Sequence, residues 1–219
     1  MAEIVFGSKT MQLLIALILV STFMILGSTR LYSCVRAFGI QSFLLACVAG
    51  TVAYSTGKDE IYIIAILTLL FKSIVIPYFL IYIIREIKVK REIELYVKIS
   101  PSLIIGGVLV VISYYLIRSI NVISELSSFA LSASMSLVSI GLFIMISRKK
   151  AIMQMLGILI MENGLFLGAI SLTHGMPLLV ELGIFFDVLI AVLIMGILIF
   201  RINKTFESVD TSMLKNLIG

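Results

Sequence analysis

The chain has 219 residues, of which 61% are hydrophobic and 13% are charged, and its formal net charge at pH 7 is +5. Its mean hydropathy is +1.20. A soluble domain has about 25% charged residues, and a disordered or collagen-like chain has much more Gly, Pro or charge. With 15 Gly and 3 Pro the chain fits neither class. The composition therefore indicates a protein that lies mostly in a membrane.

Seven apolar runs follow one another along the chain, and each is long enough to cross a bilayer as a helix of about 20 residues. We expect these spans at residues 11–27, 37–55, 61–84, 101–117, 126–147, 151–172 and 177–202. The predicted fold class is all-α, a polytopic membrane protein formed by a bundle of about seven transmembrane helices. The chain divides into an N-terminal three-helix segment (1–84), a connector (85–100) and a C-terminal four-helix segment (101–219).

The basic residues predict how this bundle is oriented. Thirteen lysines and arginines fall in loops and tails on the side of the C-terminus, and three fall on the other side. By the positive-inside rule the C-terminus is cytoplasmic and the N-terminus lies outside, as in a multi-pass protein of the inner (cytoplasmic) cell membrane. The same charges are spread over short loops next to lipid, so we expect no nucleic-acid partner. The connector alternates basic and acidic residues, which predicts a short helical or interfacial segment beside anionic lipid or, alternatively, a docking segment for a cytoplasmic partner.

One lysine and two acidic residues fall deep inside the predicted spans. Lys72 lies about 11 residues into the third span, which is about 16 Å from the outer start of the helix. Glu162 and Asp187 lie at similar depths in the sixth and seventh spans, while Glu181 is closer to the outer surface. A charge at the bilayer centre costs about 2.5–3.5 kcal/mol, so each group needs a partner, internal water or neutralisation.

Two roles for these groups are open. A low dielectric favours the neutral forms of a carboxyl and an ammonium group, so Lys72, Glu162 and Asp187 could exchange protons or ions along the middle of the membrane, with Glu181 at the mouth. The alternative is a buried ion pair that only locks the packing of helices, with the side chain of Glu181 reaching to the interface.

Other residues near these charges predict local features. Pro77 lacks an N–H and predicts a kink in the third span beside Lys72. Asn163 directly follows Glu162, and Gly164 and Gly168 have the spacing typical of close helix packing. In the fifth span, serines at four-residue intervals predict a smooth face for a neighbouring helix. These serines are Ser128, Ser132 and Ser136.

The chain lacks the patterns of a catalytic or metal-binding protein. Cys34 and Cys47 are 13 residues apart without a CxxC motif, so we interpret them as packing residues. His174 has no Cys, His or acidic cluster around it. Nothing resembles a nucleophile with its base or a phosphate-binding loop. We therefore expect no catalytic residue, metal or cofactor in this chain.

Several stretches resemble the hydrogenase-4 component E family. They are the run from Ser147-Arg148-Lys149-Lys150 to Met161-Glu162-Asn163-Gly164, residues 179–184 and 187–195, Phe71-Lys72 with Ile76-Pro77, and the tail 209–219. Residues 126–202 also resemble the small three-helix subunit of respiratory complex I and of Mrp-type cation antiporters. In that resemblance Glu162 matches the first acidic residue of the small subunit, and Asp187 lies where the small subunit has a second glutamate. Lys72 has no counterpart in the small subunit.

The resemblance implies a membrane-arm subunit of an energy-converting hydrogenase or formate hydrogenlyase complex, in which redox chemistry in partner subunits is coupled to translocation of protons or sodium. The chain would be non-catalytic on its own. Its implied partners are a hydrogenase module and antiporter-like membrane subunits, and the nickel–iron and iron–sulfur centres would belong to those partners. The alternative is a scaffold that links these subunits without carrying ions. A stand-alone transporter is typically built from paired half-repeats, which the sequence lacks.

Overall fold

The protein is described here from a computed structural model, which describes residues 9–57, 59–86, 93, 95–120, 125–173 and 196. Within these residues the chain is helical apart from turns and an isolated β-bridge, which confirms the predicted all-α class. The helices in chain order are α2 (Lys9–Gly27), α3 (Leu31–Thr56), α4 (Asp59–Leu67), η1 (Thr68–Val75), α5 (Ile76–Glu86), α6 (Ile99–Arg118), α7 (Glu125–Ser147) and α8 (Ala151–Thr173).

Six helical segments are long and apolar enough to cross a membrane, so the chain is a multi-pass membrane protein. One of them is composite, because α4, η1 and α5 follow one another without a break over residues 59–86. We call this composite helix the rod. The seventh predicted span, 177–202, lies outside the described residues except for Gly196. That residue is helical, and a Cβ added to it would lie 3.5 Å from the ring of Phe79 in α5.

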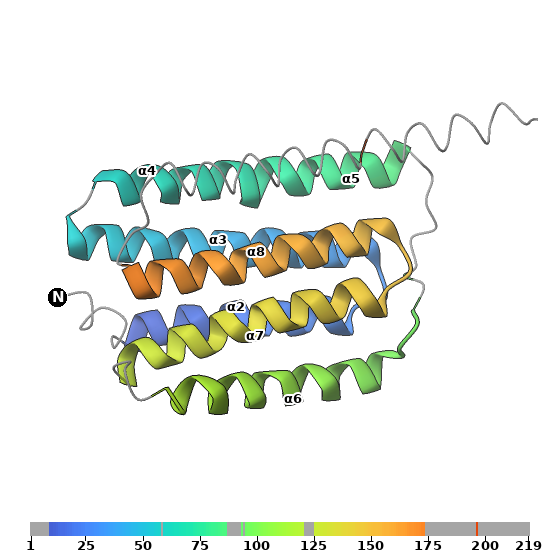
Figure 1. Cartoon of the computed structure of the whole chain (residues 1–219). Coiled ribbons are helices and arrows are strands. Elements are labelled where there is room, and N and C mark those ends of the chain that lie inside the picture. Colours follow the sequence, from blue (N-terminus) through green and yellow to red (C-terminus); the bar gives the residue numbers. More distant parts are fainter. Residues whose placement is uncertain are drawn as a thin grey trace, which may run out of the picture.

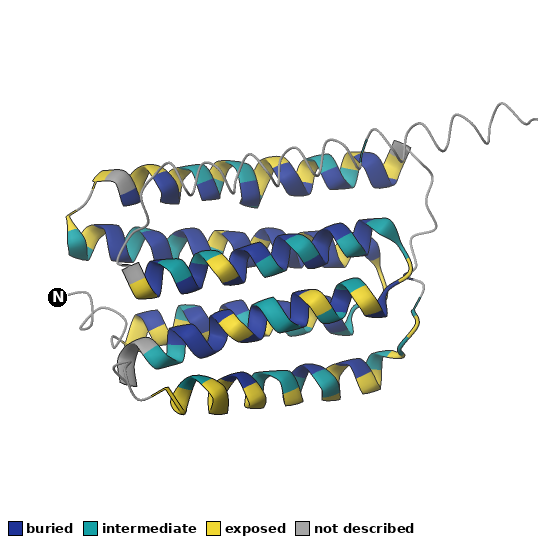
Figure 2. Cartoon of the chain, viewed as in Figure 1, coloured by how far each residue is buried: buried dark blue, intermediate teal, exposed yellow. Residues whose placement is uncertain are grey.

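The helices form a bundle with the rod at one edge and α6 at the opposite edge (Figure 1). Between these edges lie α2, α3, α7 and α8, and α8 packs against both α3 and α7. In the most apolar window of α8, 67% of the residues are buried, against 17% in α6. Figure 2 shows the same gradient, with buried residues concentrated in the inner helices. The core therefore centres on α8, whereas α6 presents most of its surface outward.

The second span begins earlier than the sequence predicted. Helix α3 starts at Leu31, six residues before the expected start at Ala37. Leu31 and Val35 are fully buried, while Arg36 is exposed on the same helix. The prediction was wrong because a charged residue was taken as part of a loop. A helix can carry such a residue on its outward face near the membrane surface.

The third span contains a π-helix close to Pro77, the residue for which the sequence predicted a kink. The η1 segment ends at Val75, two residues before Pro77, and the N–H of Ile76 donates to the carbonyl of Phe71, five residues back. Proline removes one backbone donor, and a wider turn redistributes the remaining bonds. Gly39 of α3 packs at this point, because a Cβ there would lie 3.3 Å from the carbonyl oxygen of Ser73. Lys72 lies within the π-helix.

Helices α7 and α8 pack backbone against backbone. A Cβ on Gly141 would lie 2.7 Å from the carbonyl oxygen of Gly157, and one on Gly164 would lie 2.9 Å from that of Ser134. The Ser134 hydroxyl donates to the Gly164 carbonyl at 2.7 Å, and a Cβ on Gly168 would meet that hydroxyl oxygen at 2.5 Å. Small residues at such positions allow the close approach that helices in lipid need.

The serine stripe of the fifth span lies on another side of α7. Ser132 donates to the carbonyl of Ser128, and Ser136 donates to that of Ser132, so both hydroxyls are satisfied within α7. A step of two residues turns a helix by about 200°, which places both serines away from the side where Ser134 meets α8. Since both are buried, they face the helices that pack there, α2 and α6.

Between α5 and α6, the described residues 93 and 95–98 of the connector are not helical. The N–H of Ile93 donates to the carbonyl of Thr29, that of Tyr96 donates to the carbonyl of Ser147, and Leu95 forms an antiparallel bridge with Arg148. The connector is thus tied to the turn between α2 and α3 and to the turn between α7 and α8. Residues 87–92 and 94 lie outside the described part of the chain.

Candidate functional site

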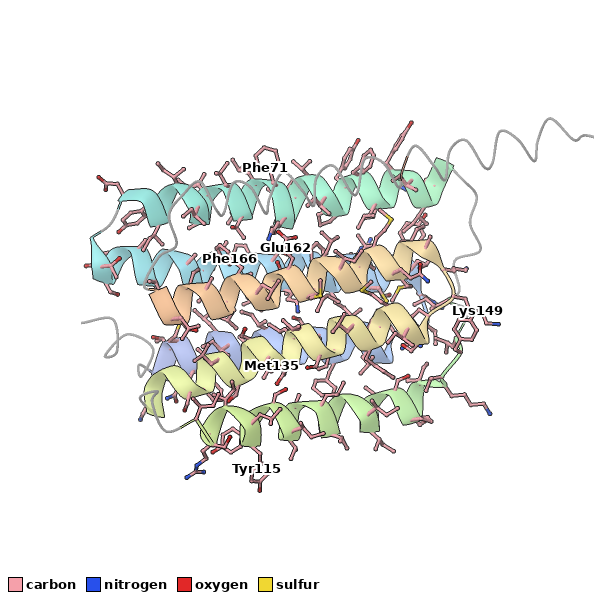
Figure 3. All side chains as sticks on the ribbon, viewed as in Figure 1. Phe71, Tyr115, Met135, Lys149, Glu162 and Phe166 are labelled. Atoms are coloured by element: carbon pink, nitrogen blue, oxygen red, sulfur yellow. The ribbon has the colours of Figure 1, made fainter. Side chains whose placement is uncertain are left out.

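Lys72 and Glu162 meet in the interior of the bundle. Lys72 lies near the middle of the rod and Glu162 near the middle of α8, and Figure 3 shows Glu162 between these two elements. The Lys72 Nζ is 2.6 Å from the Glu162 Oε1, and their side chains are 6% and 5% exposed. The two charges, which were predicted to lie at similar depths in their spans, are therefore in direct contact.

An aromatic ring of α8 lies beside this ion pair. The Nζ of Lys72 is 5.5 Å from the ring centroid of Phe166, which is one helical turn beyond Glu162. At that distance the ring face attracts the ammonium group. The ring is also an apolar neighbour, and it strengthens electrostatic interactions by keeping water away from the charges. Lys72 thus interacts with two side chains on the same side of α8.

Asn163 connects α8 to α3 through its side-chain amide. Its Nδ2 donates to the Oγ of Ser42 at 3.1 Å and to the Oε1 of Gln41 at 3.4 Å. All three side chains are fully buried. Asn163, which the sequence singled out only as the neighbour of Glu162, is therefore an interhelical hydrogen-bond donor.

The hydrogen bonds continue from α3 to α2. The Nε2 of Gln41 donates to the Oγ1 of Thr22 at 2.7 Å, and Thr22 donates to the carbonyl of Ile18 in its own helix at 2.9 Å. We call Asn163, Gln41 and Thr22 the polar chain. It crosses three helices, and every bond in it points toward α2.

Helix α3 also has a polar contact with the π-helix. The Oγ of Ser73 donates to the carbonyl of Gly39 at 3.1 Å. Each pair among α3, η1 and α8 is therefore joined by a polar contact, because the Lys72–Glu162 pair joins η1 to α8 and Asn163 joins α8 to α3. We call this meeting point the α3–η1–α8 junction.

The ion pair places a proton donor beside an acceptor. A nitrogen and an oxygen 2.6 Å apart are within hydrogen-bond reach, so moving one proton from the ammonium to the carboxylate would convert two buried charges into two neutral groups. The remaining candidates of the sequence, Asp187 and Glu181, lie outside the described residues. No group of three or more Cys, His, Asp or Glu that could hold a metal occurs among the residues that the structure describes.

Three polar residues of the site were missed by the sequence interpretation. Thr22, Gln41 and Ser42 are uncharged, so the depth comparison of charged residues did not include them. Gln41 and Ser42 nevertheless lie far inside α3, with apolar residues on both sides of them. Counting the depth of buried amides and hydroxyls as well as charges would have identified them.

Arg148 is a second feature that the sequence did not reveal. It was counted as a loop charge, but it is fully buried, and its Nη2 donates to the carbonyl of Leu26 at 2.6 Å. That carbonyl belongs to the last turn of α2, where backbone acceptors lack partners within the helix. Burial lowers the pKa of the Arg148 guanidinium from its usual value, but the group stays charged at neutral pH. Nothing in a run of three basic residues indicates which one is buried.

Comparison with curated proteins finds relatives that cover nearly the whole chain. An uncharacterized protein of Mycobacterium tuberculosis, Rv0085, is 28% identical over 202 residues, which is 91% of this chain and 92% of that protein. Hydrogenase-4 component E of Escherichia coli K12 is 24% identical over 206 residues, or 93% of this chain and 94% of that protein, and the protein of the same name from Shigella flexneri gives the same values.

No model of a protein family matches the chain, and no solved structure shows significant similarity to it. The similarity of residues 126–202 to the small subunit of complex I therefore stays a prediction from the sequence. What the comparisons establish is that the chain is similar, over nearly its whole length, to Hydrogenase-4 component E.

Proposed function

We propose that the chain is a membrane subunit of an energy-converting hydrogenase or formate hydrogenlyase complex. The similarity to Hydrogenase-4 component E over 93% of the chain supports this assignment, as do the six apolar helices. The catalytic nickel–iron and iron–sulfur centres belong to a hydrogenase module formed by other subunits, and antiporter-like subunits are the neighbours in the membrane. On its own the chain is non-catalytic.

Its role in the complex is to carry part of a relay for protons or sodium. The observation that carries this proposal is the buried pair of Lys72 and Glu162 near the middle of two membrane-spanning helices. An intramembrane ion pair of this kind is typical of ion pathways. In the proton form of the relay, the N–H bond of the ammonium breaks and an O–H bond forms on Glu162. The proton then passes to Asp187 and leaves by way of Glu181.

The distribution of basic residues supports an orientation with the C-terminus in the cytoplasm. Arg30, Arg85, Lys98 and Arg148 lie at the ends of helices or in the turns at one end of the bundle. Lys9 and Arg118 lie at the other end. Cytoplasmic loops are enriched in Lys and Arg, so the richer end is the cytoplasmic one, beside the hydrogenase module.

The test separates hydrogen production from ion translocation in the intact complex. Glu162→Gln and Asp187→Asn keep side-chain size but remove the exchangeable carboxylate. We expect both variants to assemble and produce hydrogen in inverted membrane vesicles, while acidification of the vesicles or sodium uptake is lost. Ser136→Ala is the control, because Ser136 is equally buried but its hydroxyl bonds only within α7. Normal translocation by Glu162→Gln would contradict the relay.

The same experiment distinguishes the relay from a scaffold that has no role in transport. In that case Lys72 and Glu162 only hold the rod against α8, and Glu162→Gln releases subunits from the complex. The result is loss of partners on native gels, with hydrogen production and translocation falling together. A relay instead predicts an assembled complex with translocation lost.

A further inference from the structure

At the α3–η1–α8 junction the Oε1 of Glu162 faces the ammonium of Lys72, and two further buried acceptor atoms have no hydrogen-bond partner within the described structure. They are the Oε2 of Glu162 and the Oδ1 of Asn163, which belong to consecutive residues of α8. The residues are 4% and 0% exposed. Leaving a buried polar atom unpaired costs about 1–3 kcal/mol, and more when the group is charged. Both atoms therefore need a donor.

Three nearby donors among the described side chains form hydrogen bonds elsewhere. The Nδ2 of Asn163 is directed at Ser42 and Gln41 of α3, and the Nε2 of Gln41 is directed at Thr22. The hydroxyl of Ser73 donates to the carbonyl of Gly39. The donors of these groups thus point away from the two acceptors.

Because the ion pair at the junction has no net charge, a neutral donor is favoured over a cation. The ammonium of Lys72 is 2.6 Å from the Oε1 of Glu162 and already balances its negative charge. A bound cation would add a second positive charge beside this ammonium in a region of low dielectric, where repulsion is strong. A neutral molecule with two hydrogens satisfies both acceptors without changing the net charge. Water is the smallest such molecule, and buried waters typically bind groups of this kind.

We infer that the α3–η1–α8 junction binds a water molecule that donates one hydrogen to the Oε2 of Glu162 and the other to the Oδ1 of Asn163. This water joins the ion pair to the polar chain. A hydrogen-bonded path then runs from Lys72 and Glu162 through Asn163, Gln41 and Thr22 to α2. Protonation of Glu162 would change what the water donates and accepts, so the orientation of the polar chain responds to the state of the carboxyl group.

The binding site rests on the two unpaired acceptors and on the charge of the ion pair, and the part of the water in a relay rests on the proposed function. The test is water-edited solid-state NMR of the full chain in lipid bilayers, labelled in its asparagine and glutamate side chains. The Asn163 and Glu162 signals are assigned by their loss in Asn163→Leu and Glu162→Gln. We expect rapid polarisation transfer from water to both side chains. In Asn163→Leu the transfer to Glu162 should be lost.

Two further variants keep the result interpretable. Asn163→Asp retains the size of the side chain and its acceptor, so transfer to Glu162 should persist even if the leucine variant misfolds. Ser136→Ala, on the side of α7 away from α8, should leave both signals unchanged. Absence of transfer to Asn163 and Glu162 in the wild-type chain, with normal transfer to Glu92 and Glu94 of the connector, would overturn the inference. A change in the chemical shifts of Asn163 and Glu162 when sodium chloride replaces choline chloride would also overturn the inference, because it indicates a cation at the site.

The result can be separated from that of the proposed function. If the water is detected but Glu162→Gln still translocates ions, the water site stands and the relay fails. If the water is not detected but Glu162→Gln uncouples the complex, the relay stands and the water site fails.

Discussion

Two sides of α8 meet their neighbours in opposite ways. Toward α7, glycines bring the backbones together, and a Cβ on Gly164 would lie 2.9 Å from the carbonyl oxygen of Ser134. Toward η1 and α3, the same helix presents Glu162 and Asn163, which form an ion pair and interhelical hydrogen bonds. Adjacent residues belong to opposite sides of the helix, because Gly164 of the α7 side directly follows Asn163 of the other side.

This difference shows how a small membrane protein combines firm packing with buried polarity. Apolar association contributes little between helices in lipid, so close van der Waals contact through small residues holds α7 and α8 together. Polar groups on the other side of α8 are costly in a membrane unless they are paired. The glycine interface therefore fixes the position of α8, and the junction uses that fixed position for its charged and amide groups.

The largest effect is expected from breaking the ion pair on one side only. Lys72→Met leaves the carboxylate of Glu162 buried without its counter-charge, and loss of one partner of a buried pair costs about 3–5 kcal/mol. The double variant Lys72→Met with Glu162→Gln should recover much of this stability. Thermal unfolding in detergent measures both, with Lys98→Met as the control because Lys98 is exposed. Equal stabilities of Lys72→Met and wild type would argue that the pair does not form.

A smaller but clear effect is expected at the glycine interface. Gly164→Leu places a side chain where even a Cβ would be 2.8 Å from that of Leu137, and overpacking of this kind costs about 1–3 kcal/mol or more. Gly107→Leu is the matched control, since a Cβ there meets nothing within 4 Å. The unfolding temperature should fall for Gly164→Leu alone. A similar fall for both variants would mean that leucine is harmful regardless of packing.

The smallest effect is expected for the hydrogen bond across the glycine interface. Ser134→Ala removes the donor to the Gly164 carbonyl, and interhelical hydrogen bonds in membranes contribute about 0.6 kcal/mol on average. Ser136→Ala removes a hydroxyl that bonds only within α7, so its effect should be smaller still. Chemical denaturation of the two variants side by side measures the difference. A larger loss in Ser136→Ala would reverse the assignment of the two sides of α7.

Much of the fold could be predicted because the membrane imposes a simple pattern. Long apolar runs gave the six described spans, and α7 and α8 begin and end within one residue of the predicted bounds. The start of α3 was missed because an exposed Arg36 on a buried helix looks like a loop residue in the sequence. For the region of Pro77 the sequence predicted a kink and not a π-helix, since hydropathy does not report the type of helix.

The candidate site could be predicted in part. Lys72 and Glu162 were predicted to lie at similar depths in the membrane, because a residue count along a helix measures distance across the membrane. That similarity suggested that the two residues act together. Which sides of the helices face one another depends on packing, so the polar chain through Gln41 and the burial of Arg148 required the structure. The places of Asp187 and Glu181 in the relay stay predictions.

Infrared difference spectroscopy of the intact complex during turnover tests the relay most directly. The method detects the carbonyl stretch of a protonated carboxylic acid, which shifts in deuterium oxide. The account predicts a carboxylic acid band that appears and disappears when hydrogen production is started and stopped, and that is missing in Glu162→Gln. A complex that translocates ions while Glu162 shows no change in protonation would contradict the relay.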